Sequence, residues 1–198
     1  MTAQAKITTG TARERILEVA TDLFYRQGYR ATGINEVIDK SGVAKATFYN
    51  HFPSKDVLCK DCLNGLSDNE LHFVDSAIHN ANGPLDRFLS VIQSLEPWAR
   101  DTEFRGCAFM NIASEVPEPD SPLRKVGTKL YDEIRLRVEK LTSELIESNK
   151  EKYGHLDVDT VSKCYLVAFA GAVALAEIYH AIWPIHDAVN SVRRMIGE

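Results

Sequence analysis

Apolar residues recur three and four positions apart along almost the whole chain, and no other feature limits the fold so strongly. In the first such segment, Ile16, Leu17, Ala20, Leu23 and Phe24 fall on one face of a helix. Alternation of apolar and polar residues, the pattern of a half-buried strand, is nearly absent. We therefore predict an all-α protein of about nine helices.

Start and stop signals divide the N-terminal part of the chain into three short helices. Thr11 and Glu14 have the spacing of a capping box, and Gly28 is expected to end the first helix in a left-handed conformation. Thr32 is expected to cap the second helix, and a glycine-containing turn at residues 41–43 separates this helix from the third. This arrangement predicts a helix-turn-helix domain.

The remainder of the chain has the pattern of longer helices. Ser54 is placed to cap the first of them, and Trp183-Pro184 is expected to break the chain before the last. We place a domain boundary at Ser54, between a head of residues 1–54 and a body of residues 55–198. The helices expected in the body cover residues 55–80, 84–100, 106–114, 122–152, 159–180 and 185–196.

The charge of the chain is divided unevenly between these two parts. The formal net charge of -5, taken alone, argues against a protein that binds nucleic acid. Residues 1–55, however, carry eight Lys and Arg against five Asp and Glu, a net charge of +3, and the remainder carries -8. A basic head on an acidic body indicates that the two parts meet different partners.

Several classes of protein are disfavoured by the sequence. The longest apolar run, residues 166–176, is shorter than the ~20 residues that span a bilayer, so we expect a buried helix and no membrane partner. The N-terminus has no apolar run typical of a signal peptide, and the four cysteines are expected to be thiols in the cytoplasm. Cys59 and Cys62 have metal-like spacing, but His72 lies ~15 Å further along a helix. We expect no metal and no cofactor.

The third short helix divides its residues between a packing face and an outer face. Those expected to pack inward are Val43, Phe48 and Phe52. Those expected to face outward are Lys45, Ala46, Thr47, Tyr49 and Asn50. A helical bundle with merely solvated polar residues is the alternative, but this division suits a helix that enters the major groove of DNA.

The outward residues have the chemistry of DNA recognition. Lys45 can donate to guanine, and Asn50 can pair bidentately with adenine. Tyr49 and Thr47 can donate hydrogen bonds to phosphates. Lys55 adds a positive charge at the start of the next helix, where backbone N–H groups also attract phosphate.

The segment from Arg13 to Leu58 resembles the TetR family of bacterial transcriptional regulators. The residues that carry the resemblance are Gly28, Thr32, the turn at 41–43, the Phe48–Phe52 segment FYNHF and Lys55. The resemblance implies an all-α homodimer with a DNA-binding head and a larger domain that dimerises and binds a small-molecule effector. By position it places Thr32, Thr47, Tyr49, His51 and Lys55 against the DNA backbone, and Lys45, Ala46 and Asn50 nearest the bases.

The penultimate helix is rich in alanine and glycine. A smooth stripe on it, which would allow close approach of a partner helix, comprises Ala168, Gly171, Ala172, Leu175 and Tyr179. The alternative is a helix buried wholly within its own chain. We favour a homodimer through the last two helices, because a helix so apolar needs cover on most sides and because the family resemblance places the dimer interface there.

Aromatic and soft residues in the middle of the body are candidates for an effector pocket, with plain core packing as the alternative. They are Trp98, Phe104, Cys107, Met110, Tyr131, Tyr165 and Phe169. Cys107 lies two residues after Arg105 and near the start of a helix, and both the positive charge and the helix N-terminus favour a thiolate. The sequence leaves open whether Cys107 is a sensor thiol for electrophiles or an inert core residue.

No motif of a hydrolase, a phosphate-binding loop, a dinucleotide-binding fold or a zinc protease occurs in the sequence, so we predict that the chain is not an enzyme. The predicted function is a transcriptional regulator, a repressor that binds an inverted-repeat operator as a homodimer and leaves it when an effector binds. Two alternatives remain: a DNA-binding protein without a ligand, and a helical small-molecule enzyme with a DNA-binding head.

Overall fold

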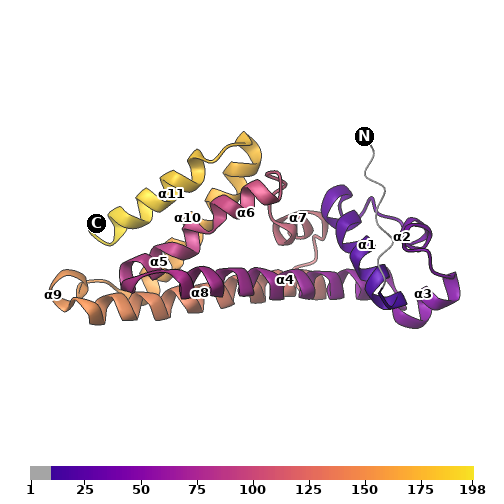
Figure 1. Cartoon of the computed structure of the whole chain (residues 1–198), viewed down its shortest axis with the longest axis horizontal. Coiled ribbons are helices and arrows are strands. Elements are labelled where there is room, and N and C mark those ends of the chain that lie inside the picture. Colours follow the sequence, from indigo (N-terminus) through magenta and orange to yellow (C-terminus); the bar gives the residue numbers. More distant parts are fainter. Residues whose placement is uncertain (1–9) are drawn as a thin grey trace. The chain divides into compact units, whose positions relative to one another are not determined.

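The computed structural model describes residues 10–198, and these residues form helices and no strand (Figure 1). The all-α prediction is confirmed. The first helices are α1 (Ala12–Gln27), α2 (Ile34–Ser41), α3 (Lys45–His51) and α4 (Lys55–Asn80). They are followed by α5 (Gly83–Gln93), α6 (Leu95–Asp101), α7 (Ala108–Glu115) and α8 (Pro122–Ser148). The last are α9 (Lys150–Tyr153), α10 (Val158–Tyr179) and α11 (Trp183–Met195).

The described residues thus hold two helices more than the nine expected, because two predicted helices are each divided. The helix expected over 84–100 is divided into α5 and α6, since Pro97 has no N–H for the carbonyl four residues earlier. The helix expected over 122–152 ends at Ser148, and Asn149 then caps the short α9 by accepting from the Lys152 N–H at 3.0 Å. The prediction overlooked Pro97 and Asn149, which interrupt the backbone hydrogen bonds although the helical apolar pattern continues past them.

The break before the last helix also lies elsewhere than expected. His180, with a left-handed φ of 49°, ends α10. Trp183 and Pro184 do not break the chain but form the first turn of α11, where a proline is tolerated because its missing N–H has no helical partner.

The helices gather into two compact units. Unit 1 contains residues 10–66 and 108–127, and unit 2 contains residues 67–107 and 128–198. The chain passes from one unit to the other within α4, between Cys107 and Ala108 before α7, and within α8. These units do not coincide with the predicted head and body, because unit 1 joins the head to residues 55–66 and 108–127. The boundary at Ser54 therefore remains a prediction about which residues contact DNA.

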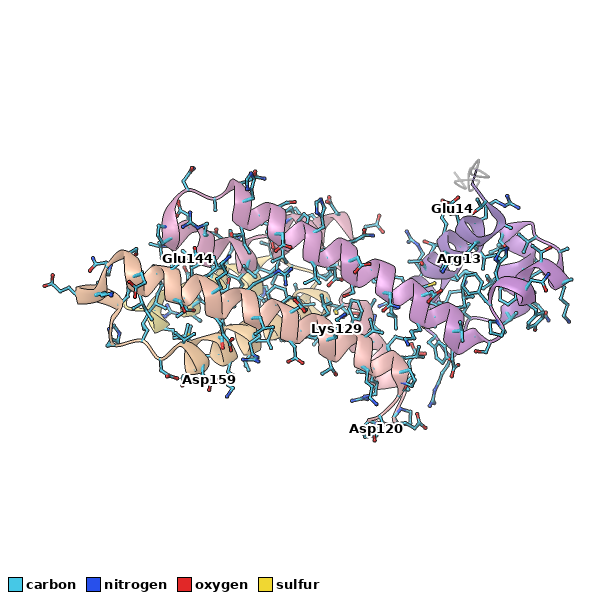
Figure 2. The ribbon with its side chains drawn as sticks, turned by 90° about the horizontal axis from the view of Figure 1, so that it is seen from below. Arg13, Glu14, Asp120, Lys129, Glu144 and Asp159 are labelled. Atoms are coloured by element: carbon cyan, nitrogen blue, oxygen red, sulfur yellow. The ribbon has the colours of Figure 1, made fainter. Side chains whose placement is uncertain are left out.

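Unit 1 has a core formed by the first four helices. The residues at its centre are Ile16, Ala20, Leu23, Val37, Ile38, Phe48, Phe52, Leu58 and Cys62. The capping box at the start of α1 is present: the Glu14 N–H donates to the Thr11 hydroxyl at 3.3 Å, and the Thr11 N–H donates to the Glu14 carboxylate at 2.8 Å. Figure 2 shows Glu14 beside Arg13 at this end of the helix. Ser54 accepts from the Val57 N–H at 3.2 Å and so begins α4, as predicted.

The start of α2 differs from the prediction. Its capping residue is Gly33, and no side chain caps the helix. The Thr32 side chain is only 1 % exposed, and its hydroxyl donates to the Gly28 carbonyl at 2.8 Å. The expected cap at Thr32 is therefore wrong: α2 begins one residue later, after Gly33, and the Thr32 hydroxyl is turned toward the preceding loop.

Unit 2 is built around α10, which packs against α11. The buried Tyr165 hydroxyl accepts from the Ile92 N–H at 2.9 Å and donates to the Phe88 carbonyl at 2.8 Å, so it ties α10 to α5. Among the described helices, α10 alone has the length and composition of a membrane span. Tyr165 and Phe169 on α10 are buried within unit 2, whereas Val167 and Ile178 on its other face are exposed, so the expected burial holds for one face only. Charged side chains such as Glu144 and Asp159 lie on the outside of this unit (Figure 2).

Candidate DNA-binding surface and effector pocket

The outer face of α3 presents the residues that the sequence places there. Lys45, Ala46, Tyr49, Asn50 and His51 are exposed, and Thr47 is half-buried. The opposite face is anchored in the core of unit 1, because Phe48 and Phe52 are fully buried. A rigid short helix with polar groups on one side and a packed aromatic pair on the other is the geometry that a recognition helix requires.

Two of the expected DNA contacts have partners within unit 1. The Thr32 hydroxyl is turned inward, so it is not exposed for a phosphate. Lys55 is half-buried: its ammonium lies 3.4 Å from the Arg30 carbonyl, to which it donates, and 4.4 Å from the centre of the Tyr29 ring. Burial lowers the pKa of Lys55 from its ordinary value. The ammonium is thus held at the loop between α1 and α2.

The same loop is held from the other side by a carboxylate that the sequence did not single out as a binding group. Glu115, the last residue of α7, accepts from the Tyr29 N–H at 3.1 Å and from the Arg30 N–H at 2.7 Å. Gly28 adopts φ 94° and ψ 161°, a region that is essentially restricted to glycine and is not the left-handed helical one expected. A Cβ there would lie 2.7 Å from the Glu115 carboxylate. Glycine at this position therefore permits the clamp.

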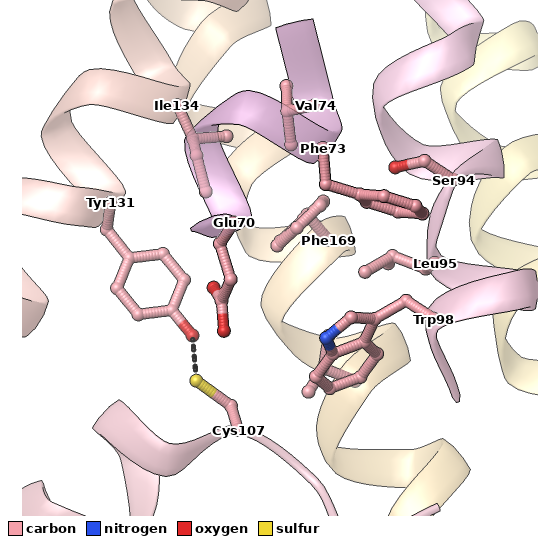
Figure 3. Close-up of a pocket in the computed structure, with 11 residues that line it drawn as sticks. Glu70, Phe73, Val74, Ser94, Leu95, Trp98, Cys107, Tyr131, Ile134 and Phe169 are labelled. Carbon is pink, nitrogen blue, oxygen red and sulfur yellow. Dashed lines mark hydrogen bonds between the residues drawn. The ribbon is translucent and has the colours of Figure 1, made fainter. Parts of the chain in front are cut away.

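Unit 2 contains a narrow pocket between α4, α6, α8 and α10 (Figure 3). Its cavity volume is about 30 Å³. The lining residues are Glu70, Phe73, Val74, Ser94, Leu95, Trp98, Cys107, Tyr131, Ile134, Phe169 and Val173. The structure therefore brings together four of the predicted effector residues, namely Trp98, Cys107, Tyr131 and Phe169.

The other three predicted effector residues lie outside this pocket. Tyr165 is a core residue whose hydroxyl is satisfied by α5. Phe104 stacks against His180 with ring centroids 4.7 Å apart. Met110 belongs to unit 1. Aromatic composition alone could not separate pocket walls from core, since both are buried apolar surfaces.

Among the lining residues that the sequence analysis did not predict, Glu70 matters most for the chemistry of the pocket, because it brings a carboxyl group into it. It is a charged side chain in a polar stretch of α4, which the sequence gives no reason to place inside. Figure 3 shows its carboxyl group pointing between Tyr131, Cys107 and Trp98. Burial raises the pKa of Glu70 to about 7.

Cys107 is buried and lies with its sulfur 3.3 Å from the Tyr131 hydroxyl (Figure 3). The loop before it has unusual backbone geometry: Glu103 and Phe104 have φ values of 53° and 56°. Gly106 has φ 80°, and a Cβ there would lie 1.9 Å from the Glu177 carboxylate, which also pairs with Arg105 at 3.4 Å. The segment Arg105-Gly106-Cys107 therefore fixes the thiol at the pocket wall.

The stripe predicted for dimerisation is partly exposed. Leu175 and Tyr179 are exposed, whereas Ala168 and Gly171 are half-buried. Ala172 is 3 % exposed, so it packs within its own chain and offers little surface to a partner helix. The two most exposed apolar side chains on these helices, Val167 and Ile178, were not predicted, and neither was the exposed Trp183.

Cys59 and Cys62 are buried in unit 1, and burial raises the pKa of the Cys62 thiol to about 11. These are packed, protonated thiols. Within residues 10–198 no group of three or more His, Cys, Asp or Glu side chains is arranged to hold a metal ion.

The fold, the anchored recognition helix and the separate pocket define a helix-turn-helix DNA-binding regulator. Residues 16–62 match the model of the family described as bacterial regulatory proteins, tetR family. Two regulators of Bacillus subtilis are similar in sequence. YxaF, named as uncharacterized, is 30% identical over 62% of this chain and 65% of its own length. LmrA is 30% identical over 63% of this chain and 67% of its own length.

The chain thus spans about two thirds of these relatives. A crystal structure of a TetR-family regulator from Streptomyces coelicolor superposes with a TM-score of 0.82 and 26% identity, over 94% of this chain and 96% of that one. The chain belongs to the TetR family. It is a DNA-binding transcriptional regulator and not an enzyme.

Proposed function

We propose that this protein is a cytoplasmic repressor that binds an inverted-repeat operator as a homodimer and leaves it when a small molecule occupies the pocket of unit 2. The observation that carries the proposal is the separation of tasks within one chain. An exposed polar face on α3 is anchored in unit 1, and a pocket with aromatic walls and one carboxyl group lies in unit 2.

On DNA, we assign Asn50, Lys45 and Ala46 to the bases and Thr47, Tyr49 and His51 to the sugar–phosphate backbone. Base-edge contacts specify sequence, whereas phosphate contacts fix register. Lys55 is assigned to phosphate as well, and it would exchange the Arg30 carbonyl for a phosphate oxygen. The predicted phosphate contact of Thr32 would require the loop to rearrange, because its side chain is buried and its backbone N–H donates to the Gly28 carbonyl at 3.3 Å.

Apolar exposure on α10 and α11 supports the homodimer. Val167 is 74 % exposed and Ile178 is 72 % exposed, and Trp183 stacks on Tyr179 with ring centroids 5.0 Å apart. Covering such side chains is favourable by about 25 cal/mol per Å² of apolar surface. A two-fold dimer would read two half-sites one helical turn, or a multiple of it, apart.

Dimerisation is tested by sedimentation equilibrium of the full chain at micromolar concentration. Val167→Glu is expected to give monomers, since a carboxylate would be desolvated in the interface. Leu136→Glu is the matched control, because Leu136 is 50 % exposed on α8 and lies outside the proposed interface. A monomeric parent chain, or equal effects of both substitutions, would refute the assignment.

Coupling between the pocket and the DNA-binding helix is proposed to follow two covalent routes. Glu70 lies on α4, the helix that begins at Lys55. Cys107 directly precedes α7, whose last residue, Glu115, clamps the loop between α1 and α2. A ligand that shifts either helix would alter the pose of α3, and allosteric coupling of ~1–3 kcal/mol changes affinity 5- to 150-fold.

The whole proposal is tested by selecting binding sites from random duplex DNA and footprinting the best sequence with the full chain. Protection of an inverted repeat, relieved by a compound found in a thermal-shift screen, is the expected result. Binding that is indifferent to sequence and falls steeply with salt would instead favour a ligand-independent DNA-binding protein.

A further inference from the structure

The pocket of unit 2 combines aromatic walls with a single group able to carry charge. Phe73, Trp98, Tyr131 and Phe169 supply aromatic surface from four helices. Glu70 supplies the carboxyl group, and no Lys, Arg or His side chain is among the described residues that line the pocket. Within residues 10–198 the Glu70 carboxyl group has neither a hydrogen bond nor an ion pair. The pocket thus holds a partly buried acid without a partner.

We propose that this pocket binds an organic cation, a quaternary ammonium or a protonated amine, whose positive charge lies between the Glu70 carboxylate and the ring of Trp98. This inference rests on the proposed function, since it names the chemical class of the effector. A cation positioned over an indole ring is attracted by the negative face of the ring, and Trp is the strongest of the aromatic side chains in this respect. The carboxylate adds a direct charge attraction that is strengthened by burial.

The same groups disfavour the other ligand classes. An anion would lie against the carboxylate in a pocket with no compensating cation. A neutral ligand could form a hydrogen bond with the carboxyl group but would leave the ionised form without an opposite charge. Two other polar positions of the wall are already engaged: Ser94 donates to the Val91 carbonyl at 2.8 Å, and the Cys107 sulfur lies 3.3 Å from the Tyr131 hydroxyl. The indole N–H of Trp98 lies on the side of the ring that faces Glu70 (Figure 3).

Binding of a cation is expected to be linked to the proton on Glu70. With a pKa of about 7, the carboxyl group is partly protonated at neutral pH, and a cation binds the ionised form and releases the proton. The groups that face Glu70 are the Tyr131 phenol, whose pKa burial raises, and the Cys107 thiol that is hydrogen-bonded to it. A ligand with a permanent charge should therefore bind about tenfold more tightly at pH 8 than at pH 6.

The cavity is too small for an organic ligand as it stands, so we expect the pocket to open on binding. A space of about 30 Å³ holds a few water molecules and not a whole organic ligand. Phe73 is exposed and Trp98 is half-buried, and the proposal requires these two rings to move outward as a ligand enters. Binding should therefore change the environment of Trp98, which makes its fluorescence a direct reporter.

The experiment compares phenyltrimethylammonium with its uncharged carbon isostere, tert-butylbenzene, on the full chain without DNA. The Trp183→Phe background leaves Trp98 as the only tryptophan. We expect the cation to quench or shift Trp98 fluorescence and to bind about tenfold more tightly than the isostere at pH 8. The preference should shrink as the pH falls to 6.

Glu70→Gln is expected to abolish both the preference for the cation and its pH dependence, while the weak binding of tert-butylbenzene persists. Asp68→Asn is the matched control, since it removes one negative charge from the exposed side of the same helix and should change neither. Equal affinity for the two compounds, or a preference that survives Glu70→Gln, would overturn the proposal. If neither compound binds, yet other molecules release DNA, the ligand class is wrong while the regulatory function stands.

Discussion

The core around α3 in unit 1 and the pocket of unit 2 are assembled from contacts of very different range along the chain. The packed face of α3 and the core around it come from residues 16–62, a single continuous segment of short helices. The pocket of unit 2 takes its walls from residues between Glu70 and Val173, on helices separated by long stretches of sequence. Local patterns therefore specify the first site, whereas the second exists only after the whole unit has packed.

The two sites also differ in how far their residues can change without disturbing the fold. The face of α3 leaves little choice, since Phe48 and Phe52 must pack and their neighbours must face out. The pocket can change its ligand through one residue such as Glu70 without disturbing the core residue Tyr165. A regulator built in this way keeps its means of reading DNA while its effector changes.

The largest expected effect comes from removing a buried ring in each unit. Phe48→Ala and Phe88→Ala each delete a fully buried phenyl ring, at a cost of about 3–5 kcal/mol in the free energy of unfolding. Both tryptophans lie in unit 2, so their fluorescence reports that unit while circular dichroism reports all helices. Phe48→Ala should lower the dichroism midpoint and abolish DNA binding but leave the fluorescence midpoint in place.

Phe88→Ala should instead lower the fluorescence midpoint. If both substitutions shift both midpoints equally, the two units unfold as one cooperative unit, and they differ in structure but not in stability. Urea titration followed by the two signals on the same sample decides between these results.

The sequence predicted unit 1 more completely than unit 2 for physical reasons. The capping box at Thr11 and Glu14 and the Ser54 cap depend on neighbours within a few residues, and the core around Phe48 comes from one continuous segment. The wrong cap at Thr32 shows where local prediction fails. Its hydroxyl donates to the Gly28 carbonyl, and the path of the loop between these residues could not be predicted from the sequence.

In unit 2 the aromatic residues were visible but their grouping was not. Trp98 and Tyr131 meet in the pocket, whereas Tyr165 and Phe104 pack elsewhere with the same apolar character. Glu70 was invisible as a site residue, since a glutamate in a polar stretch is expected to face solvent. The clamp of Glu115 on Tyr29 joins residues 86 positions apart, and no local pattern announces it.

The next largest effect tests whether the loop of unit 1 depends on that clamp. Gly28→Ala places a Cβ against the Glu115 carboxylate at a backbone conformation that only glycine adopts readily, and it should cost about 1–3 kcal/mol. Glu115→Ala removes two acceptor bonds and should cost less, about 1–2 kcal/mol. Dichroism midpoints measure both costs.

In the double variant the strain of Gly28→Ala should be partly relieved, because the clashing carboxylate is gone. Simple additivity of the two costs would show that the clamp and the glycine act independently. Glu118→Ala, in the loop after α7, is the matched control and should change neither midpoint.

A smaller and more specific effect is expected on base preference. Asn50→Ala should cost about 1–3 kcal/mol on the preferred operator and almost nothing on unrelated DNA, so it lowers the specificity ratio. Competition between the two DNAs in a gel-shift or anisotropy assay measures this ratio. An equal loss on both DNAs would reassign Asn50 from a base to the backbone.

The smallest effect, and the sharpest contrast with Asn50, is expected from Lys55. Lys55→Ala should weaken binding evenly across sequences and lower the slope of log affinity against log salt by about 1 per subunit. The even loss follows because a phosphate contact carries no sequence information. Lys60→Ala, an exposed lysine on the same helix, is the control for a general change in charge.

The structure gives Lys55 a second possible role, because its ammonium also holds the Arg30 carbonyl and the Tyr29 ring. Lys55→Arg separates the two roles, since arginine keeps the charge but not the compact geometry of an ammonium. Retention of the salt slope by Lys55→Arg supports the phosphate contact. An unchanged slope in Lys55→Ala, with a lowered melting temperature, would instead make Lys55 a structural brace of the loop that Glu115 clamps.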